Sequence, residues 1–205
     1  MEMGWLEKRL LQTSAWGWLS RRILIPWVFR FARPPEDAEV LELGCGSGSE
    51  AVALLERFPR WHLTATDYDP EMVALATDRL APCGSSVRVQ AADATALPFG
   101  DSSFDLVVAV LVWHHVGDWR RATAEAHRVL RPGGWLILAD LLAPFFAGVT
   151  RRLFAPARTY TFDELRAAVA TVGFRLWRTS VTPFWYRAVA QSEKPSPAHD
   201  PHHKQ

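Results

Sequence analysis

Cysteine is scarce in this sequence, with only two among 205 residues. Cys45 lies in a glycine-rich stretch and Cys83 lies between Pro82 and Gly84, so their number and spacing support neither a disulfide framework nor a metal site. An excess of charge of one sign is also lacking, because 23 basic residues face 22 acidic ones and the formal net charge is +1. The first absence indicates a reducing compartment, which we interpret as the cytoplasm. The second argues against a nucleic-acid partner.

Long uncharged hydrophobic runs are missing too. The most apolar stretch, residues 15–31, is interrupted by three arginines and by Pro26, which excludes a membrane span and does not fit a signal peptide. Its apolar residues recur at spacings of three and four, which predicts one or two amphipathic helices. We interpret residues 1–35 as an N-terminal helical lid on the same domain. The alternative is that its tryptophans and arginines contact an anionic or lipid-like ligand, or a membrane surface.

Strand-like and helix-like segments alternate within residues 36–190, which predicts one α/β domain. With 49% apolar residues the chain can bury a sizeable core. A helix stop and a turn are predicted at residues 131–134, which read Arg-Pro-Gly-Gly. Residues 191–205 are polar and rich in proline, so we expect a disordered tail. Strands are predicted at residues 39–43, 61–67, 87–91, 104–112 and 135–140, and helices at 49–58, 70–80 and 121–130.

The last third of the domain departs from this alternation. Thr161 and Glu164 have the spacing of a capping box, which predicts a helix over residues 165–172. Two strand-like segments, residues 174–181 and 184–190, follow with only a Thr-Pro dipeptide between them. Such a short connection requires antiparallel pairing, because parallel neighbours need a crossover of a dozen residues or more.

A glycine-rich turn joins the first predicted strand to the first predicted helix. Residues 42–48 read Glu-Leu-Gly-Cys-Gly-Ser-Gly. A strand, a glycine turn and a helix in this order are typical of a site for a nucleoside-bearing ligand, because glycines let the chain turn sharply and let a ligand approach the backbone. The dinucleotide fingerprint is G-x-G-x-x-G, whereas this run is G-x-G-x-G after an acid. The spacing therefore disfavours an NAD(P)-dependent oxidoreductase, which stays as an alternative.

Residues 42–48 resemble the first motif of the class I S-adenosylmethionine-dependent methyltransferases, and residues 92–99 and 113–135 are similar to later segments of the type 11 subgroup. That subgroup includes quinone-biosynthesis and small-molecule methyltransferases. The resemblance implies a Rossmann-like three-layer sandwich, with helices on both faces of a mostly parallel seven-stranded sheet of order 3-2-1-4-5-7-6 whose last strand is antiparallel. It also implies S-adenosylmethionine as the cofactor. The cofactor-binding residues that it implies are Glu42, Gly44, Cys45, Gly46, Gly48, Asp67, Tyr68, Asp93, Ala94 and Val110.

The resemblance implies different roles for the acids. Asp67 ends a strand and would accept hydrogen bonds from both ribose hydroxyls; the alternative role of helix cap suits Asp69 better. Asp93 would accept from the adenine amino group, or alternatively cap a turn. Glu42 is a strand acid for which the ammonium group of the cofactor is the natural partner, through water. Cys45 is interpreted as a small apolar filler, because no basic partner that could activate it as a nucleophile lies nearby in the sequence.

Methyl transfer from a sulfonium needs in-line positioning of the acceptor and exclusion of water, without a metal or a covalent nucleophile. A base is needed only when the acceptor atom carries a proton at neutral pH. His114 and His115 follow the fourth predicted strand and are the candidate catalytic residues, with a hydrogen bond to loop backbone as the alternative role. We expect only one of the two to face the pocket.

The acceptor is predicted to be a small or lipid-like molecule, bound by the N-terminal segment and by residues 141–160. A non-catalytic cofactor-binding subunit stays as an alternative, because no residue is obligatory for methyl transfer. Nucleic-acid methylation is disfavoured by the lack of an appended basic module. The predicted location is cytoplasmic, with peripheral membrane contact if the N-terminal helices bind lipid. The sequence makes no prediction of the oligomeric state. Three arginines could extend a basic rim around the acceptor, Arg151, Arg152 and Arg158.

Overall fold

The computed structural model describes residues 5–141, 160–182 and 185–195. Within them the chain forms a seven-stranded sheet of order β3-β2-β1-β4-β5-β7-β6. Strand β7 pairs antiparallel with β5 and β6, whereas the other neighbours pair in parallel. The predicted sheet order and fold class are therefore confirmed. The strands are β1 (Ala38–Leu43), β2 (Trp61–Asp67), β3 (Val87–Ala91), β4 (Phe104–Val110), β5 (Leu130–Leu141), β6 (Phe174–Val181) and β7 (Trp185–Ser192).

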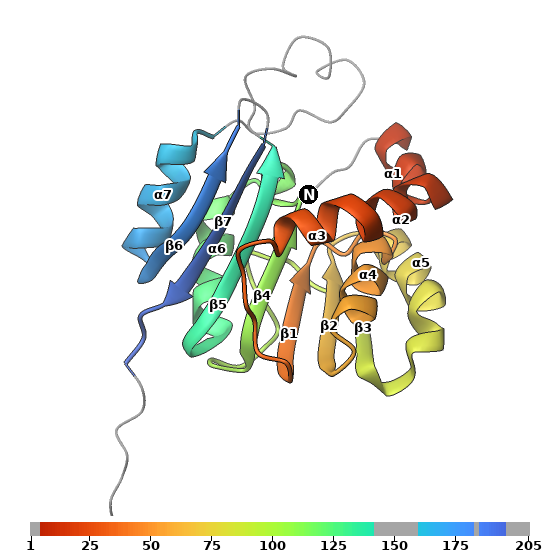
Figure 1. Ribbon diagram of the computed structural model, residues 1–205, viewed down its shortest axis with the longest axis horizontal. Coiled ribbons are helices and arrows are strands. Elements are labelled where there is room, and N and C mark those ends of the chain that lie inside the picture. The colour runs from red at the N-terminus through yellow and green to blue at the C-terminus, as the bar shows by residue number, and fades with distance from the viewer. Residues whose placement is uncertain (1–4, 142–159, 183–184, 196–205) are drawn as a thin grey trace, which may run out of the picture.

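Helices cover both faces of the sheet (Figure 1). Strands β1 and β4 are buried almost throughout, as expected of central strands in a parallel sheet that is covered on both faces. The carboxyl ends of the five parallel strands lie along one edge of the sheet, where the loops with most of the predicted site residues begin. The helices that follow the first strand are α4 (Ser49–Arg57), α5 (Pro70–Leu80), α6 (Trp119–Val129) and α7 (Phe162–Thr171), with 3-10 helices η2 (Ala81–Ser86) and η3 (Trp113–His115).

Local signals in the sequence determine where two of these helices begin. Asp69 accepts a hydrogen bond from the backbone N–H of Glu71 at 2.9 Å and caps α5. Thr161 and Glu164 make both halves of the predicted capping box at the start of α7. The predicted cap residues are thus confirmed.

The N-terminal segment packs against the sheet through its last third. Leu24, Ile25 and Val28 belong to the same core cluster as residues of β1 and β4. Figure 1 shows this segment crossing the front of the sheet near the upper ends of β1 and β2. A role as a lid stays a prediction. Among the described residues, no helix combines the length and apolar character needed to cross a membrane. The segment consists of α1 (Trp5–Leu11), α2 (Ser14–Leu19), the π-helix η1 (Ser20–Leu24) and α3 (Ile25–Val28).

Some predicted boundaries are wrong. Helix α6 spans Trp119–Val129 rather than residues 121–130. Residues 131–134 belong to β5 rather than to a free turn, because Leu130 already pairs with Phe104 of β4 and the irregularity in the ladder includes the Gly-Gly pair. Strand β4 ends at Val110 rather than at residue 112. Strand β7 continues to Ser192, beyond the predicted end at residue 190. The predicted strand start at residue 184 and the rest of the predicted tail from residue 196 lie outside the described residues.

Candidate functional site

The glycine-rich turn between β1 and α4 has a backbone that only glycine adopts readily. Gly44, Gly46 and Gly48 have φ angles of 68°, 52° and 83°. A Cβ on Gly44 would lie 2.6 Å from a methyl carbon of Val112, which leaves no room for a side chain. The turn thus brings bare main chain to the carboxyl end of β1, as a close-fitting ligand requires.

Asp67 lies at the end of the neighbouring strand β2 and is only 2% exposed. Its carboxylate accepts hydrogen bonds from the backbone N–H groups of Gly46, at 2.8 Å, and Asp69, at 2.9 Å. Burial raises the pKa of Asp67, while these two hydrogen bonds act in the opposite direction. A carboxylate offers about four lone-pair sites, so the two bonds leave acceptor capacity for a ligand hydroxyl.

Glu42 is the most unusual group in this part of the molecule. It is 3% exposed, and its Oε2 atom has no hydrogen-bond partner among the described residues. Burial raises the pKa of Glu42 well above its ordinary value, and the charges of Glu50 and Asp67 raise it further. A positively charged ligand bound here would favour the ionised form of these neighbouring buried acids.

Cys45 is completely buried in the turn. Burial raises the pKa of its thiol well above the ordinary value, and the charges of Glu42 and Asp67 raise it further. A thiol that resists ionisation is a poor nucleophile, as expected of a filler.

The remaining predicted cofactor residues follow the ends of β2, β3 and β4. Asp93 accepts from the backbone N–H and the hydroxyl of Thr95, both at 2.8 Å, so the hydrogen bonds of the alternative turn-capping role are present. Ala94 and Val110 are each 8% exposed, whereas Tyr68 is 48% exposed. The structure thus brings all ten predicted residues to the same edge of the sheet, with Asp93 and Tyr68 on its surface.

His114 belongs to a buried polar network at the ends of β4 and β5. Its Nδ1 is paired with the carboxylate of Asp140, and its backbone N–H donates to the same carboxylate at 3.1 Å. The hydroxyl of Tyr160 donates to Asp140 at 3.3 Å and is hydrogen-bonded to the hydroxyl of Tyr186 at 2.6 Å. Burial, and after it the charge of Asp140, raises the pKa of both tyrosines, which keeps their hydroxyls neutral.

This arrangement suits proton transfer. Asp140 favours the tautomer of His114 in which Nδ1 carries the proton, so that Nε2 bears the lone pair and can accept one. His115 is less buried, and its ring centroid lies 3.9 Å from that of His114. Of the two predicted histidines, only His114 is hydrogen-bonded to the buried carboxylate of Asp140 in the described part of the chain.

The sequence interpretation missed Asp140, Tyr160 and Tyr186. Asp140 lies at the end of the fifth predicted strand, so the rule that selected Asp67 could have found it. The two tyrosines carry no local signal, because their role depends on contacts between distant segments. Glu50 was also missed: the indole of Trp16 and the hydroxyl of Ser20 donate to its carboxylate, each at 2.8 Å. The predicted acceptor-side residues Arg151, Arg152 and Arg158 lie outside the described residues.

Comparisons with known proteins identify the domain in which this candidate site lies. Residues 41–138 match the family model described as a methyltransferase domain. The demethylmenaquinone methyltransferase of Thermus thermophilus is 37% identical over 105 residues, which are 51% of this chain and 48% of that protein. The malonyl-[acyl-carrier protein] O-methyltransferase of Geobacter sulfurreducens is 34% identical over 163 residues, which are 71% of this chain and 58% of that protein. The chain thus spans about half the length of these curated relatives.

A solved structure shares the fold. The crystal structure of a SAM-dependent methyltransferase from Aquifex aeolicus superposes with a TM-score of 0.72 at 19% identity and covers 91% of this chain and 97% of that chain. None of these three proteins supports the oxidoreductase alternative. Residues 41–138 are therefore a methyltransferase domain, in agreement with the class I S-adenosylmethionine-dependent methyltransferases that the sequence resembles.

Proposed function

We propose that the chain is an enzyme that transfers a methyl group from S-adenosylmethionine to a small-molecule acceptor. The observation that carries the proposal is the buried Glu42, whose unpartnered Oε2 lies in a cluster of acids beside the glycine turn. S-adenosylmethionine fits this site, because its ammonium and sulfonium groups supply the positive charge that the acids lack. When bound, it supplies a methyl group on a leaving group that needs no further activation.

Four groups of residues would hold this cofactor. The turn formed by Gly44, Gly46 and Gly48 would pass around its methionine portion, with Cys45 filling the space behind. Glu42 would receive the ammonium group, and Asp67 the ribose hydroxyls. The adenine would lie near Ala94 and Val110, with Asp93 at its amino group and Tyr68 at the outer rim. The contact of Asp93 with the adenine amino group would compete with the hydrogen bonds that Asp93 already accepts from Thr95.

We assign the base function to His114. A proton on the acceptor atom would move to Nε2 of His114 while Asp140 stabilises the resulting imidazolium. Tyr160 would hold Asp140 in place as a neutral donor, with its own hydroxyl hydrogen-bonded to that of Tyr186, which keeps the imidazole oriented. His115, whose ring lies against that of His114, would border the acceptor.

The acceptor that suits this base is a small molecule with an acidic O–H or C–H group. The names of the two curated relatives mention demethylmenaquinone and, with methylation on oxygen, malonyl-[acyl-carrier protein]. A lipid-like acceptor is the finer proposal, supported by the exposed Leu10, Trp18 and Ile23 of the N-terminal segment. It implies action in the cytoplasm, with contact at the membrane surface.

Two measurements test the proposal. In calorimetry on the purified chain, we expect S-adenosylhomocysteine to bind saturably while NADH and NADPH do not. A screen with methyl-labelled S-adenosylmethionine against quinones, phenols, amines and lipids should then label one acceptor class. Binding of a nicotinamide nucleotide in place of S-adenosylhomocysteine would refute the proposal. Saturable binding without transfer to any class would instead favour the non-catalytic subunit.

A further inference from the structure

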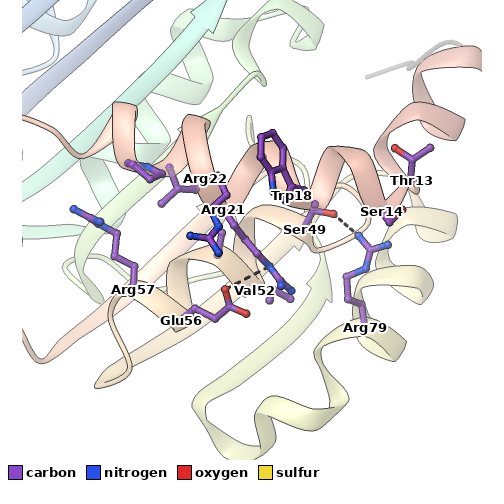
Figure 2. A pocket seen from close by; sticks show the side chains of 14 residues that line it. Thr13, Ser14, Trp18, Arg21, Arg22, Ser49, Val52, Glu56, Arg57 and Arg79 are labelled. Atoms are coloured by element: carbon purple, nitrogen blue, oxygen red, sulfur yellow. Dashed lines mark hydrogen bonds and ion pairs between the residues drawn. The ribbon is translucent and has the colours of Figure 1, made fainter.

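A second concave site lies away from the strand ends. A cavity of about 610 Å³ separates the N-terminal segment from α4 and reaches Arg79 on α5 (Figure 2). Its volume is within the range of small-molecule sites. It contains none of the ten predicted cofactor residues and neither of the two histidines. The methyl-transfer site therefore does not account for it.

Basic side chains dominate the lining of this cavity. Four arginines line it, and Glu56 is the one acid among the residues that form its wall. Arg21 pairs with Glu56 at 3.4 Å. Arg22 and Arg57 form no ion pair in the described parts of the chain, although Arg57 also lies 5.5 Å from the ring centroid of Phe58. Concave surfaces lined by one sign of charge concentrate ions of the opposite sign.

Arg79 lies at one end of the cavity and already has hydrogen-bond partners within the protein. Its guanidinium donates to the hydroxyls of Ser47, at 2.8 Å, and Ser49. Figure 2 shows Arg79 pointing toward Ser49. Burial raises the pKa of Glu50 and the charge of Arg79 opposes this shift, so part of that charge is used inside the protein. The uncompensated positive charge therefore rests mainly on Arg22 and Arg57.

The backbone that presents two of the arginines is unusual. Arg21 and Arg22 lie in the π-helix η1, and segments of this rare geometry occur frequently at functional sites. The next turn of the chain adds apolar lining, since Ile25 and Pro26 border the cavity together with Val52 of α4. The cavity is thus cationic at the arginines and apolar beside them.

We propose that this cavity binds a phosphate monoester or diester attached to an apolar body. Guanidinium groups bind phosphate oxygens with paired, charge-assisted hydrogen bonds, and Thr13, Ser14 and Ser49 add hydroxyl groups to the wall. The volume exceeds what one phosphate fills, so the remainder of the ligand packs on the apolar wall. The phosphate belongs either to a soluble metabolite or to a lipid headgroup, and Trp18, 60% exposed at the cavity, is available to either. The proposal does not depend on methyl transfer.

Calorimetry on the full chain with two probes tests this inference. The probes are phenyl phosphate, which is soluble, and monomeric dihexanoyl phosphatidic acid, each at fixed low ionic strength. We expect at least one probe to bind saturably, with the soluble probe favoured if the ligand is a metabolite and the lipid probe favoured if it is a headgroup. Binding of neither probe would overturn the proposal.

Matched variants locate the binding. Arg22→Gln combined with Arg57→Gln should weaken the bound probe by about tenfold or more, because both unpaired cations are lost. The control Arg166→Gln combined with Arg175→Gln removes the same charge from exposed sites on α7 and β6 and should leave the affinity within about twofold. Arg22→Lys with Arg57→Lys should retain part of the affinity. Unchanged S-adenosylhomocysteine binding verifies folding in each variant. Equal losses in the cavity variant and the control would overturn the proposal, since they indicate a general charge effect.

Discussion

Replacing Glu42 with glutamine should stabilise the ligand-free protein while weakening cofactor binding. Glu42 is 3% exposed, and its Oε2 atom has no partner within the described residues. Burial raises its pKa well above the ordinary value of 4.5, since the charged form is disfavoured inside the protein. Glu42→Gln removes the charge and keeps the shape, so the desolvation penalty of the carboxylate disappears together with its attraction for a cationic ligand.

The pH dependence follows from the direction of the pKa shift. An acid whose folded-state pKa is raised binds more protons in the folded state than in the unfolded state, so its contribution to stability falls as pH rises above 4.5. One group contributes at most about 1.4 kcal/mol per pH unit, which sets an upper limit of roughly 3 kcal/mol between pH 5 and pH 7.5. The amide left behind still lacks a partner, which offsets part of the gain. We therefore expect Glu42→Gln to raise the free energy of unfolding by about 1–3 kcal/mol more at pH 7.5 than at pH 5.

Urea unfolding at the two pH values, without ligand, measures this difference. The control is Glu39→Gln, an exposed acid on the same strand, whose effect should stay within about 0.5 kcal/mol at both. Calorimetry with S-adenosylhomocysteine should show an affinity for Glu42→Gln that is lower by about tenfold or more. If Glu42→Gln lowers stability equally at pH 5 and pH 7.5, the carboxylate is stabilised within the protein and the reasoning is refuted.

Three other substitutions test the remaining parts of the account. Asp140→Asn should reduce kcat by about 100-fold or more for an acceptor that loses a proton, while KM stays unchanged. The limb of the pH–rate profile that reports the histidine should also change. An unchanged profile would show that Asp140 is not a positioning residue. Gly44→Ala should destabilise the chain by about 1–3 kcal/mol in urea unfolding, because its φ of 68° and the contact with Val112 both oppose a side chain; wild-type stability would contradict the described turn. Thr161→Ala should cost about 0.5–2 kcal/mol through loss of the helix cap, while S-adenosylhomocysteine affinity stays the same; a change in that affinity would link α7 to the site.

The sequence predicted some elements to the residue because their boundaries depend on local chemistry. Residues 61–67 and 70–80 match β2 and α5, since Asp69 caps the helix and a proline occupies its first position. The start of β5 at Leu130 could not be predicted in the same way. The Arg-Pro-Gly-Gly segment has the composition of a turn, and only its pairing with β4 shows that it lies within a strand. Pairing between distant segments overrides local preference there.

The residues of the candidate site likewise fall into those that local sequence position predicts and those that depend on distant contacts. Strand-terminal position was enough to select Asp67 and His114, because parallel strands bring their carboxyl ends to one edge. The same rule was not applied to Asp140, so the sequence interpretation missed the residue that is hydrogen-bonded to His114. Glu50 could not have been found at all, since its donors Trp16 and Ser20 lie 34 and 30 residues away.

The net charge of this sequence conceals a separation of charge that only the structure shows. A value of +1 suggested that no strong field acts on ligands, yet the opposite charges occupy different places. Glu42 and Asp67 gather at the glycine turn, where a cationic cofactor fits, whereas Arg22 and Arg57 line the cavity beside α4. Fields in solution fade over about 8–10 Å at ordinary ionic strength, so each site responds to its own few charges and not to the sum. Of these five side chains, Arg79 alone connects the two sites. It donates a hydrogen bond to Ser47 of the glycine turn and also lines the cavity, so its charge acts on both sites.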